Sequence, residues 1–322
     1  MISLNEAAGF LREADHILVL SHQCPDGDTL GSAAALCLGL QKLGKHAMVK
    51  CSDEITPKFR YLFGGIKSED FVPSYIVAVD IADLPLFGEP NRSLYGDRVD
   101  LCIDHHPSNT QYAKHTYANA KAAATCEIIY RILKLLDVEI DRDIAASLYT
   151  GISTDTGCFK YTNVTPDTYR IAADLVETGI DAPAINRTMF DTKTRARMEL
   201  ERRAIDSLEY FCNDRVAVIS VTRAMVEETG ATEDDMEGLA SIPRGIEGVR
   251  IGVMIKEKKD GVFKVSLRAQ PPANASEICA KFGGGGHAGA AGCTFETTLA
   301  EAKKQIVEAI GEYLNRGELW TA

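Results

Sequence analysis

Three short apolar runs in this sequence lead straight into acidic or imidazole side chains. The run at residues 17–21 is followed by His22, the run at 75–79 by Asp80, and the run at 99–103 by Asp104. Helical patterns separate the runs, and this alternation predicts a parallel sheet covered by helices. Open α/β sheets of this kind bind their ligands where the strands end. We therefore expect the polar residues to meet at one edge of the sheet.

The length of the chain predicts two domains. With 322 residues, of which 45% are hydrophobic, the sequence exceeds what one compact core usually accommodates. The helical patterns of the first part run over residues 29–43, 122–136, 142–151 and 166–179, the last of them preceded by Thr165 as its cap. We expect a first domain at residues 1–184 and a charge-rich helical linker or hinge at residues 185–211.

The second domain is expected at residues 212–322. A strand pattern at 216–221 and a helical pattern at 224–229 open it, and a helical pattern at 299–314 ends it. Between them, residues 249–256 and 262–268 have the pattern of a hairpin, because Asp260-Gly261 is a typical turn pair. The predicted fold class is α/β: a parallel-sheet domain with helices on both faces, a smaller α/β domain, and a cleft between them.

Charge and composition exclude some classes of protein. The net charge of −11 disfavours binding along a long nucleic acid, because such binding depends on neutralising phosphates. A nucleic-acid substrate should therefore be short. The nine cysteines are scattered, without the paired spacing of zinc or redox sites. We find neither a signal-peptide pattern nor an apolar run long enough to span a membrane, and we expect a cytoplasmic location.

Four segments carry side chains that suit divalent metal ions: His22, Asp26 and Asp28 in the first, Asp80 in the second, Asp104-His105-His106 in the third, and Asp155 in the fourth. Carboxylates with a few imidazoles are what a pair of catalytic divalent cations requires. Each segment also has another interpretation: a solvated loop in which Asp28 caps a helix, a solvent-facing Asp80, a surface turn, or an Asx-turn at Asp155. Their occurrence together favours a metal-dependent phosphoryl-transfer enzyme.

The order of these motifs, His-x-x-x-Asp-x-Asp, Asp, Asp-His-His and Asp, resembles the DHH phosphoesterase superfamily. In the second half, Ser266-Leu267-Arg268 and the glycine-rich residues 283–292 resemble the signature of the accessory DHHA1 domain. The resemblance covers nearly the whole chain. A compact pair of these domains is similar to the NrnA-type oligoribonucleases, which trim very short RNAs and in many members also dephosphorylate 3′-phosphoadenosine 5′-phosphate.

The resemblance implies roles for residues of both domains. It implies two divalent cations, with manganese preferred: one held by His22, Asp26 and Asp80, the other by Asp28, Asp80, His105 and Asp155. Asp80 would bridge the two cations and belong to the catalytic group together with His106, which would contact the scissile phosphate. Arg268, Gly284, Gly285 and His287 would bind a terminal phosphate of the substrate. The implied partners are short single-stranded RNA, dinucleotides and small nucleotides, and the family similarity also suggests a homodimer.

Other functions stay open at this point. A stand-alone phosphodiesterase for cyclic di-AMP or linear dinucleotides would use the same two domains. A manganese inorganic pyrophosphatase is disfavoured because its Ser-Arg-Lys-Lys type motif is lacking, and a RecJ-like exonuclease is expected to carry further DNA-binding regions. A non-enzymatic nucleotide-binding module would require an incomplete set of metal ligands. His16, His46 and His115 lie outside the matching motifs, and we expect them to be surface or structural residues.

Overall fold

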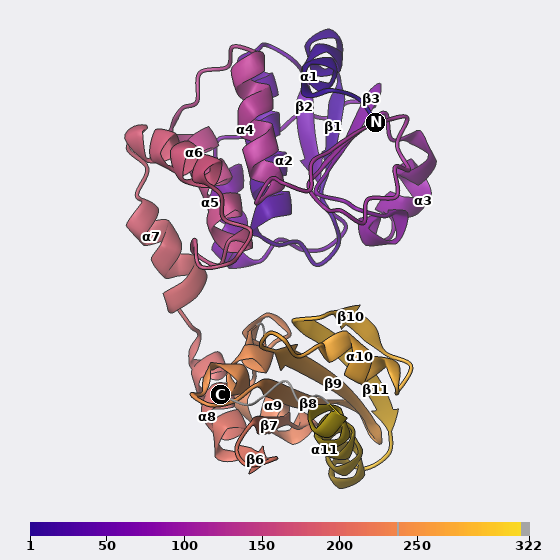
Figure 1. Cartoon of the computed structure of the whole chain (residues 1–322). Coiled ribbons are helices and arrows are strands. Elements are labelled where there is room, and N and C mark those ends of the chain that lie inside the picture. Colours follow the sequence, from indigo (N-terminus) through magenta and orange to yellow (C-terminus); the bar gives the residue numbers. More distant parts are fainter. Residues whose placement is uncertain (237, 317–322) are drawn as a thin grey trace. The chain divides into compact units, whose positions relative to one another are not determined.

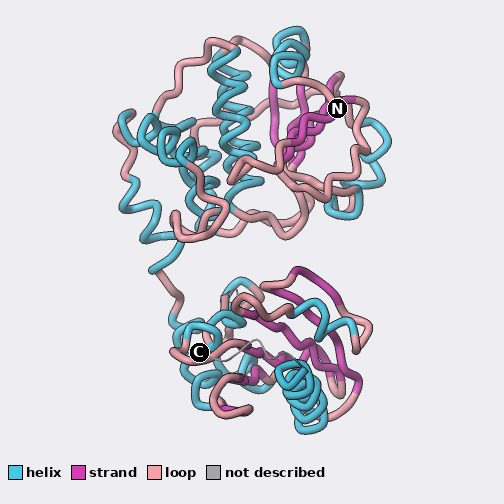
Figure 2. Tube along the Cα trace, in the orientation of Figure 1, coloured by secondary structure: helices cyan, strands magenta, loops and turns pink. Residues whose placement is uncertain are grey.

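The structure is a computed structural model that describes residues 1–236 and 238–316. The chain divides between Thr192 and Lys193 into two compact units (Figure 1). This division falls within the segment 185–211 predicted as a linker, whose action as a hinge stays a prediction. Figure 2 shows a first unit with many helices around its strands and a second unit that is rich in strands.

The five strands of the first unit form one parallel sheet in the order β2-β1-β3-β4-β5. They span Ile17–Leu20 (β1), Ala47–Lys50 (β2), Tyr75–Val79 (β3), Leu101–Asp104 (β4) and His115–Ala118 (β5). The three apolar runs are thus confirmed as strands, although β4 starts two residues later than predicted and includes Asp104. The edge strands β2 and β5 are only partly buried, and their apolar runs are shorter than those of buried parallel strands, with three consecutive apolar residues in β2.

Apolar layers cover both faces of this sheet, as predicted. One face packs against the helices α1 (Leu4–Glu13), α2 (Gly27–Lys42), α4 (Thr125–Leu135) and α5 (Arg142–Asp155). The other face, with Leu18, Leu20 and Ile76, packs against Phe87 of the 3-10 helix η2 (Leu84–Phe87) and Tyr95 of α3 (Asn91–Tyr95). The remaining helices of the unit are η1 (Pro57–Phe63), η3 (Gly96–Arg98), α6 (Pro166–Glu177), α7 (Ala182–Asn186) and the π-helical η4 (Arg187–Asp191).

Helices α2 and α5 pack antiparallel at very short range. A Cβ added to Gly31 of α2 would lie only 2.4 Å from the carbonyl oxygen of Ser147 in α5, so only glycine allows this approach. Gly27, at the start of α2, lies against Thr154, near the end of α5. The close contact therefore brings the first turn of α2 next to the last turn of α5. The end of α5 differs from the prediction. The helix was predicted to end at residue 151, but it extends to Asp155, which is therefore its last residue and not part of a following loop.

The six strands of the second unit form a mixed sheet in the order β10-β11-β9-β8-β7-β6. They span Glu209–Phe211 (β6), Val216–Val221 (β7), Ile251–Lys259 (β8), Val262–Ala269 (β9), Gly285–His287 (β10) and Ala290–Glu296 (β11). Only β7 and β8 are parallel among the described pairs. The predicted hairpin is confirmed, since β8 and β9 are antiparallel and joined at Asp260-Gly261.

Helices cover different parts of the two faces of this sheet. Ile278 of α10 (Ala275–Ala280) and Ile306 and Ile310 of α11 (Leu299–Arg316) pack on β8 and β9. On the opposite face, Leu200 of α8 (Arg195–Asp206) packs against Ile219. The other helices are α9 (Arg223–Thr229), η5 (Asp234–Met236), η6 (Leu239–Ser241) and η7 (Pro243–Gly245). Helix α8, predicted as a connecting helix, thus contributes to the core of the second unit.

None of the helices among the described residues has the length and apolar character that crossing a lipid bilayer would require.

Candidate metal centre

Asp80 lies at the centre of the polar cluster at the carboxyl edge of the parallel sheet. It directly follows β3, and it is only 2% exposed. Its Oδ2 lies 3.7 Å from Nε2 of His22, and its Oδ1 lies 3.6 Å from Nε2 of His105. The backbone φ of 61° places Asp80 in the left-handed region, so the chain turns immediately after the strand. The predicted meeting point at the strand exits is therefore present.

The other predicted ligands complete two adjoining groups. In the first, Nε2 of His22 lies 3.7 Å from Oδ1 of Asp26, the residue that caps α2. In the second, Nε2 of His105 lies 3.9 Å from Oδ2 of Asp28 and 3.5 Å from Oδ2 of Asp155. The ligand atoms of each group, His22-Asp26-Asp80 and Asp28-His105-Asp155, all lie within 4.8 Å of one another. The structure thus brings all six predicted ligand side chains together.

The distances within these groups suit a cation between the side chains. At 3.5–3.9 Å, the nitrogen and oxygen atoms are too far apart for direct hydrogen bonds. Two ligand atoms that share one ion, each bonded to it at about 2.0–2.2 Å, have separations in this range. Nδ1 of His22 contacts the carbonyl oxygen of Gln23 at 2.8 Å, and Nδ1 of His105 contacts that of Ala122 at 3.2 Å. Donation from Nδ1 leaves Nε2 of both rings as an acceptor for a metal ion.

The close carboxylates can be ionised together only at a cost in energy, which a nearby positive charge would remove. Burial, together with the neighbouring charges of Asp80, Asp155 and Asp26, raises the pKa of Asp28 well above its usual value. Burial likewise raises the pKa of Asp155 to about 6. Carboxylates this close repel one another when ionised, and a divalent cation removes that cost. The donor set therefore fits hard divalent metal ions.

Helix α4 supports two of these carboxylates, which the sequence motifs did not predict. The backbone N–H of Thr125 donates to Oδ2 of Asp28 at 2.6 Å, and that of Cys126 donates to Oδ1 at 2.9 Å. The hydroxyl of Thr125 donates to Oδ1 of Asp80 at 2.8 Å. The amino end of a helix favours negative charge, so α4 holds Asp28 both by hydrogen bonds and by its dipole. The sequence gives a weak signal only, the run of small residues before Thr125 that allows a close approach.

His106 has a different partner from His105. Its Nδ1 lies 2.7 Å from Oδ1 of Asp104 and 3.6 Å from Oδ1 of Asp80. The hydrogen bond with Asp104, assisted by the charge of Asp80, raises the pKa of His106 to about 9. Asp104 is fully buried and also accepts a hydrogen bond from the amide of Asn109 at 2.6 Å. The pair therefore presents a fixed imidazolium beside the candidate metal groups, which fits the predicted contact with a substrate phosphate.

In the second unit, two predicted substrate-binding residues lie on one rung of the sheet. Ala290 of β11 pairs with Arg268 on one side and with His287 on the other. Directly paired residues project from the same face of a sheet, and two strand spacings separate Arg268 from His287 by about 10 Å. Lys264 lies on the same face, four residues before Arg268 on β9. Residues of the opposite parity, such as Val265 and Leu267, are buried in the core. We call the face with Lys264, Arg268 and His287 the basic face.

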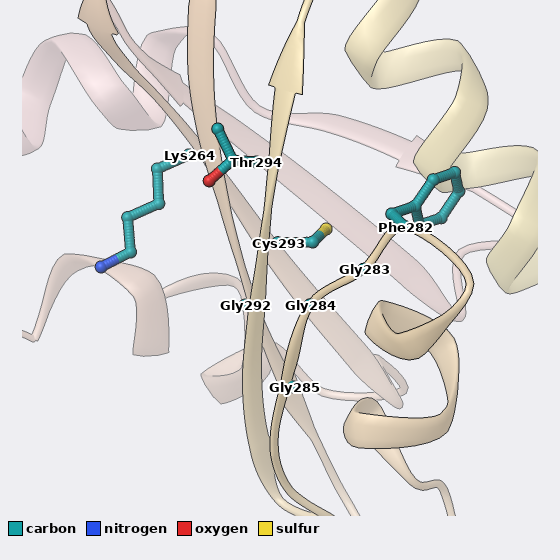
Figure 3. A pocket seen from close by; sticks show the side chains of 8 residues that line it. All are labelled: Lys264, Phe282, Gly283, Gly284, Gly285, Gly292, Cys293 and Thr294. Atoms are coloured by element: carbon teal, nitrogen blue, oxygen red, sulfur yellow. The ribbon is translucent and has the colours of Figure 1, made fainter.

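The glycine-rich segment is a short hairpin rather than the flexible loop that its composition suggests, because β10 and β11 pair within it. A Cβ on Gly284 would lie 2.2 Å from the carbonyl oxygen of Gly292, so the close approach of these two segments requires glycine here. Gly284 and Gly285 line a pocket of about 420 Å³ together with Lys264, Phe282, Gly283, Gly292, Cys293 and Thr294 (Figure 3). Among the residues labelled there, Lys264 supplies the positive charge.

Known families and proteins match both units. The model of the DHH family, N-terminal domain, matches residues 16–152, and that of the DHHA1 domain matches residues 213–316. A bifunctional oligoribonuclease and PAP phosphatase NrnA from Thermus thermophilus is 32% identical over 311 residues, which cover 93% of this chain and 90% of that protein.

Solved structures agree in fold. An exopolyphosphatase-related protein from Bacteroides fragilis has a TM-score of 0.86 at 24% identity and covers 97% of this chain and 96% of its own. RecJ in complex with Mn²⁺ from Thermus thermophilus has a TM-score of 0.55 at 18% identity, covering 96% of this chain and 55% of its own. The two matched domains and the extent of the similarity to NrnA lead to one conclusion: the chain belongs to the DHH–DHHA1 family, in its NrnA group.

Proposed function

We propose that this chain is a two-metal phosphoesterase that hydrolyses short oligoribonucleotides to mononucleotides and also converts 3′-phosphoadenosine 5′-phosphate to AMP. Support comes from the NrnA relative, whose name states both activities and which aligns over nearly the whole of both chains. The single observation that carries the proposal is the convergence of three aspartates and two histidines around Asp80, from the ends of strands, the start of α2 and the end of α5.

We assign the metal ligands by these contacts. One cation would be held by His22, Asp26 and Asp80, and the second by Asp28, His105 and Asp155, with Asp80 close enough to serve both. We propose manganese for both positions, because the shell is rich in oxygen and the RecJ structure of the same fold contains Mn²⁺. When bound, such a pair of cations neutralises the phosphate charge and lowers the pKa of the attacking water.

The chain's own residues then position the phosphate. Asp104 fixes Nδ1 of His106, and Nε2–H remains as a donor to an oxygen of the scissile phosphate. In the hydrolysis, the oxygen of water bonds to phosphorus, the bond from phosphorus to the 3′ oxygen breaks, and that oxygen takes up a proton. The hydrogen bond with Asp104 favours the imidazolium form of His106, whose side chain is 40% exposed, so the ring is placed to stabilise the negative charge of the transition state.

The basic face of the second unit supplies the proposed second anchor. Arg268 presents a planar guanidinium, which binds phosphate oxygens in pairs, and His287 lies on the same rung of the sheet. Gly285 begins the strand that contains His287 and pairs with Gly292 of β11, and Gly284 lies against the carbonyl oxygen of the same Gly292. We propose that these groups bind a terminal phosphate of a short substrate. Such a local anchor agrees with a net-acidic chain that does not track along long nucleic acids.

The test is an assay of the purified chain with Mn²⁺ on a panel of substrates: pApA, 3′-phosphoadenosine 5′-phosphate, cyclic di-AMP and pyrophosphate. We expect turnover of the first two with the highest kcat/KM. Cyclic di-AMP as the preferred substrate would support the alternative phosphodiesterase function. No turnover of any of the four, in a protein that binds Mn²⁺, would contradict the proposed enzyme and favour a nucleotide-binding module.

A further inference from the structure

Asp15, His16 and His46 form a separate cluster of ligand side chains in the first unit. Asp15 and His16 immediately precede β1, and His46 immediately precedes β2. These strands are parallel neighbours, paired from Ile17 with Ala47 onward, so the cluster lies at the amino ends of the strands. Asp80 and the candidate metal centre lie at the carboxyl ends. The four residues of β1 separate the two edges by about 13 Å.

The distances within the cluster match the spacing of ligands around one metal ion. Nδ1 of His16 and Nδ1 of His46 each lie 3.4 Å from Oδ2 of Asp15, and the three ligand atoms lie within 4.8 Å of one another. The His46–Asp15 contact is a hydrogen bond at the long limit of its range, since N–H···O distances are usually about 2.7–3.2 Å. The measured distance equals the separation of about 3.4 Å between two ligands of a tetrahedral ion with bonds of about 2.1 Å.

The backbone around the cluster holds its side chains in place. Oδ1 of Asp15 accepts the backbone N–H of His46 at 2.8 Å, and this bond turns Oδ2 toward the two rings. The carbonyl oxygen of Asp15 accepts the hydroxyl of Ser74 at 2.7 Å. The rings of His16 and His46 stack with their centroids 4.6 Å apart, and Phe71 packs edge-on against His16 at 5.2 Å. The ligands therefore come from fixed strand starts, and a bound ion requires little further ordering.

The donor set selects a different class of metal from that of the candidate centre at Asp80. Two imidazole nitrogens and one carboxylate oxygen suit Zn²⁺, Co²⁺, Ni²⁺ or Cu²⁺, whereas an oxygen-rich shell suits Mn²⁺ and Mg²⁺. The three side chains are about half exposed, which leaves a coordination position open to water. We propose that Asp15, His16 and His46 form a second metal site, which binds Zn²⁺ through three protein ligands and links the starts of β1 and β2.

The experiment is a Zn²⁺ titration of the ¹⁵N-labelled full chain, followed by the imidazole ¹⁵N resonances of the seven histidines. Because NMR reports each ring separately, zinc bound at the Asp80 centre is not confused with zinc bound here. We expect the rings of His16 and His46 to shift together along one saturating curve. Mg²⁺ at the same concentration should leave both unchanged. His115, which stacks on Phe10 outside the cluster, serves as the control ring within the same molecule.

A matched variant tests the role of the carboxylate. Asp15→Asn keeps the size of the side chain but removes its charge, and it should weaken zinc binding at His16 and His46 by about tenfold or more, since even an outer-shell partner is typically worth that much. His115→Ala should leave the affinity unchanged. Any one of three results would overturn the proposal. The rings of His16 and His46 could bind zinc with different affinities, or Asp15→Asn could leave the affinity unchanged. In the wild-type chain, the two rings could also show no shift when the rings of His22 and His105 are saturated. Whether the rings of His16 and His46 shift at all is measured on the wild-type chain. This result therefore depends neither on the folding of a variant nor on the proposed enzyme activity.

Discussion

Thr125 holds Asp80 through its side chain: the hydroxyl of Thr125 donates to Oδ1 of Asp80 at 2.8 Å, while the backbone N–H of the same residue donates to Asp28 at 2.6 Å. One residue at the start of α4 thus orients two carboxylates that lie on different elements of the first unit. In the proposed enzyme, Asp28 would bind one cation, and Asp80 would bind both that cation and the other one. Thr125 therefore sets the relative position of the two metal positions.

We predict that Thr125→Val weakens the activation by Mn²⁺ about 10- to 100-fold, the usual effect of losing an outer-shell hydrogen bond. The backbone bond to Asp28 is kept in this variant, so the loss isolates the contact with Asp80. Thr125→Ser keeps the hydroxyl and should stay close to the wild type. The measurement is the Mn²⁺ concentration at half-maximal activity. If Val and Ser variants have the same midpoint, the hydroxyl has no role in metal binding.

Asp104 should act through His106 rather than by itself. Asp104→Asn removes the charge that holds the imidazolium of His106, and we expect kcat to fall by about 10²-fold, the scale on which proton and charge donors contribute. In a double-mutant cycle, adding Asp104→Asn to His106→Ala should cause little further loss. The check is kcat/KM of the two single variants and the double variant at saturating Mn²⁺. Additive losses would show that Asp104 has a role independent of His106.

Arg268 should contribute to binding of a terminal phosphate and not to the chemical step. Arg268→Ala is expected to raise KM for 5′-phosphorylated dinucleotides by about tenfold or more, with little change in kcat, as for loss of a charged hydrogen bond. The control is the same dinucleotide without its 5′-phosphate, for which wild type and variant should have similar KM. An unchanged KM for the phosphorylated substrate would remove this assignment.

Two adjacent glycines allow a matched test of the hairpin in the second unit. A Cβ on Gly284 would meet the backbone of Gly292 at 2.2 Å, whereas one on Gly285 would meet no atom within 4 Å. We predict that Gly284→Ala destabilises the second unit by about 1–3 kcal/mol, the usual cost of overpacking. Gly285→Ala should change its stability by less than about 0.5 kcal/mol. Urea unfolding of both variants checks this, and equal stabilities would contradict the close contact.

The sequence was sufficient for the parallel sheet and for the convergence of the ligands. Buried parallel strands such as β3 are continuous apolar runs, and parallel strands place the residues that follow them at one edge. Asp80 and His105 could therefore be located without coordinates. The edge strand β2 could not, because its partly buried segment Ala47–Lys50 has only three consecutive apolar residues, too few to indicate a strand.

The contacts of α4 with Asp28 and Asp80 could not be predicted from the sequence, because the contacting residues lie far apart along the chain. Thr125 contacts Asp28 only because α2, α4 and α5 pack together, and no local pattern around residue 125 reports that packing. The strand structure of the glycine-rich segment could not be predicted either, because its local composition is typical of a flexible loop, whereas β10 is fixed by pairing with β11, which in turn pairs with β9. The position of Arg268 and His287 on either side of Ala290 likewise depends on the register of β9, β10 and β11.

The central claim is that six side chains, Asp80 and five neighbours, hold two cations. Anomalous diffraction from crystals grown with Mn²⁺, measured at the manganese edge, tests it most directly. We predict two manganese peaks, one beside His22 and Asp26, the other beside His105 and Asp155, with the carboxylate of Asp80 between them. A crystal of active protein with no manganese at Asp80, or with Asp80 bound to neither ion, would contradict the account.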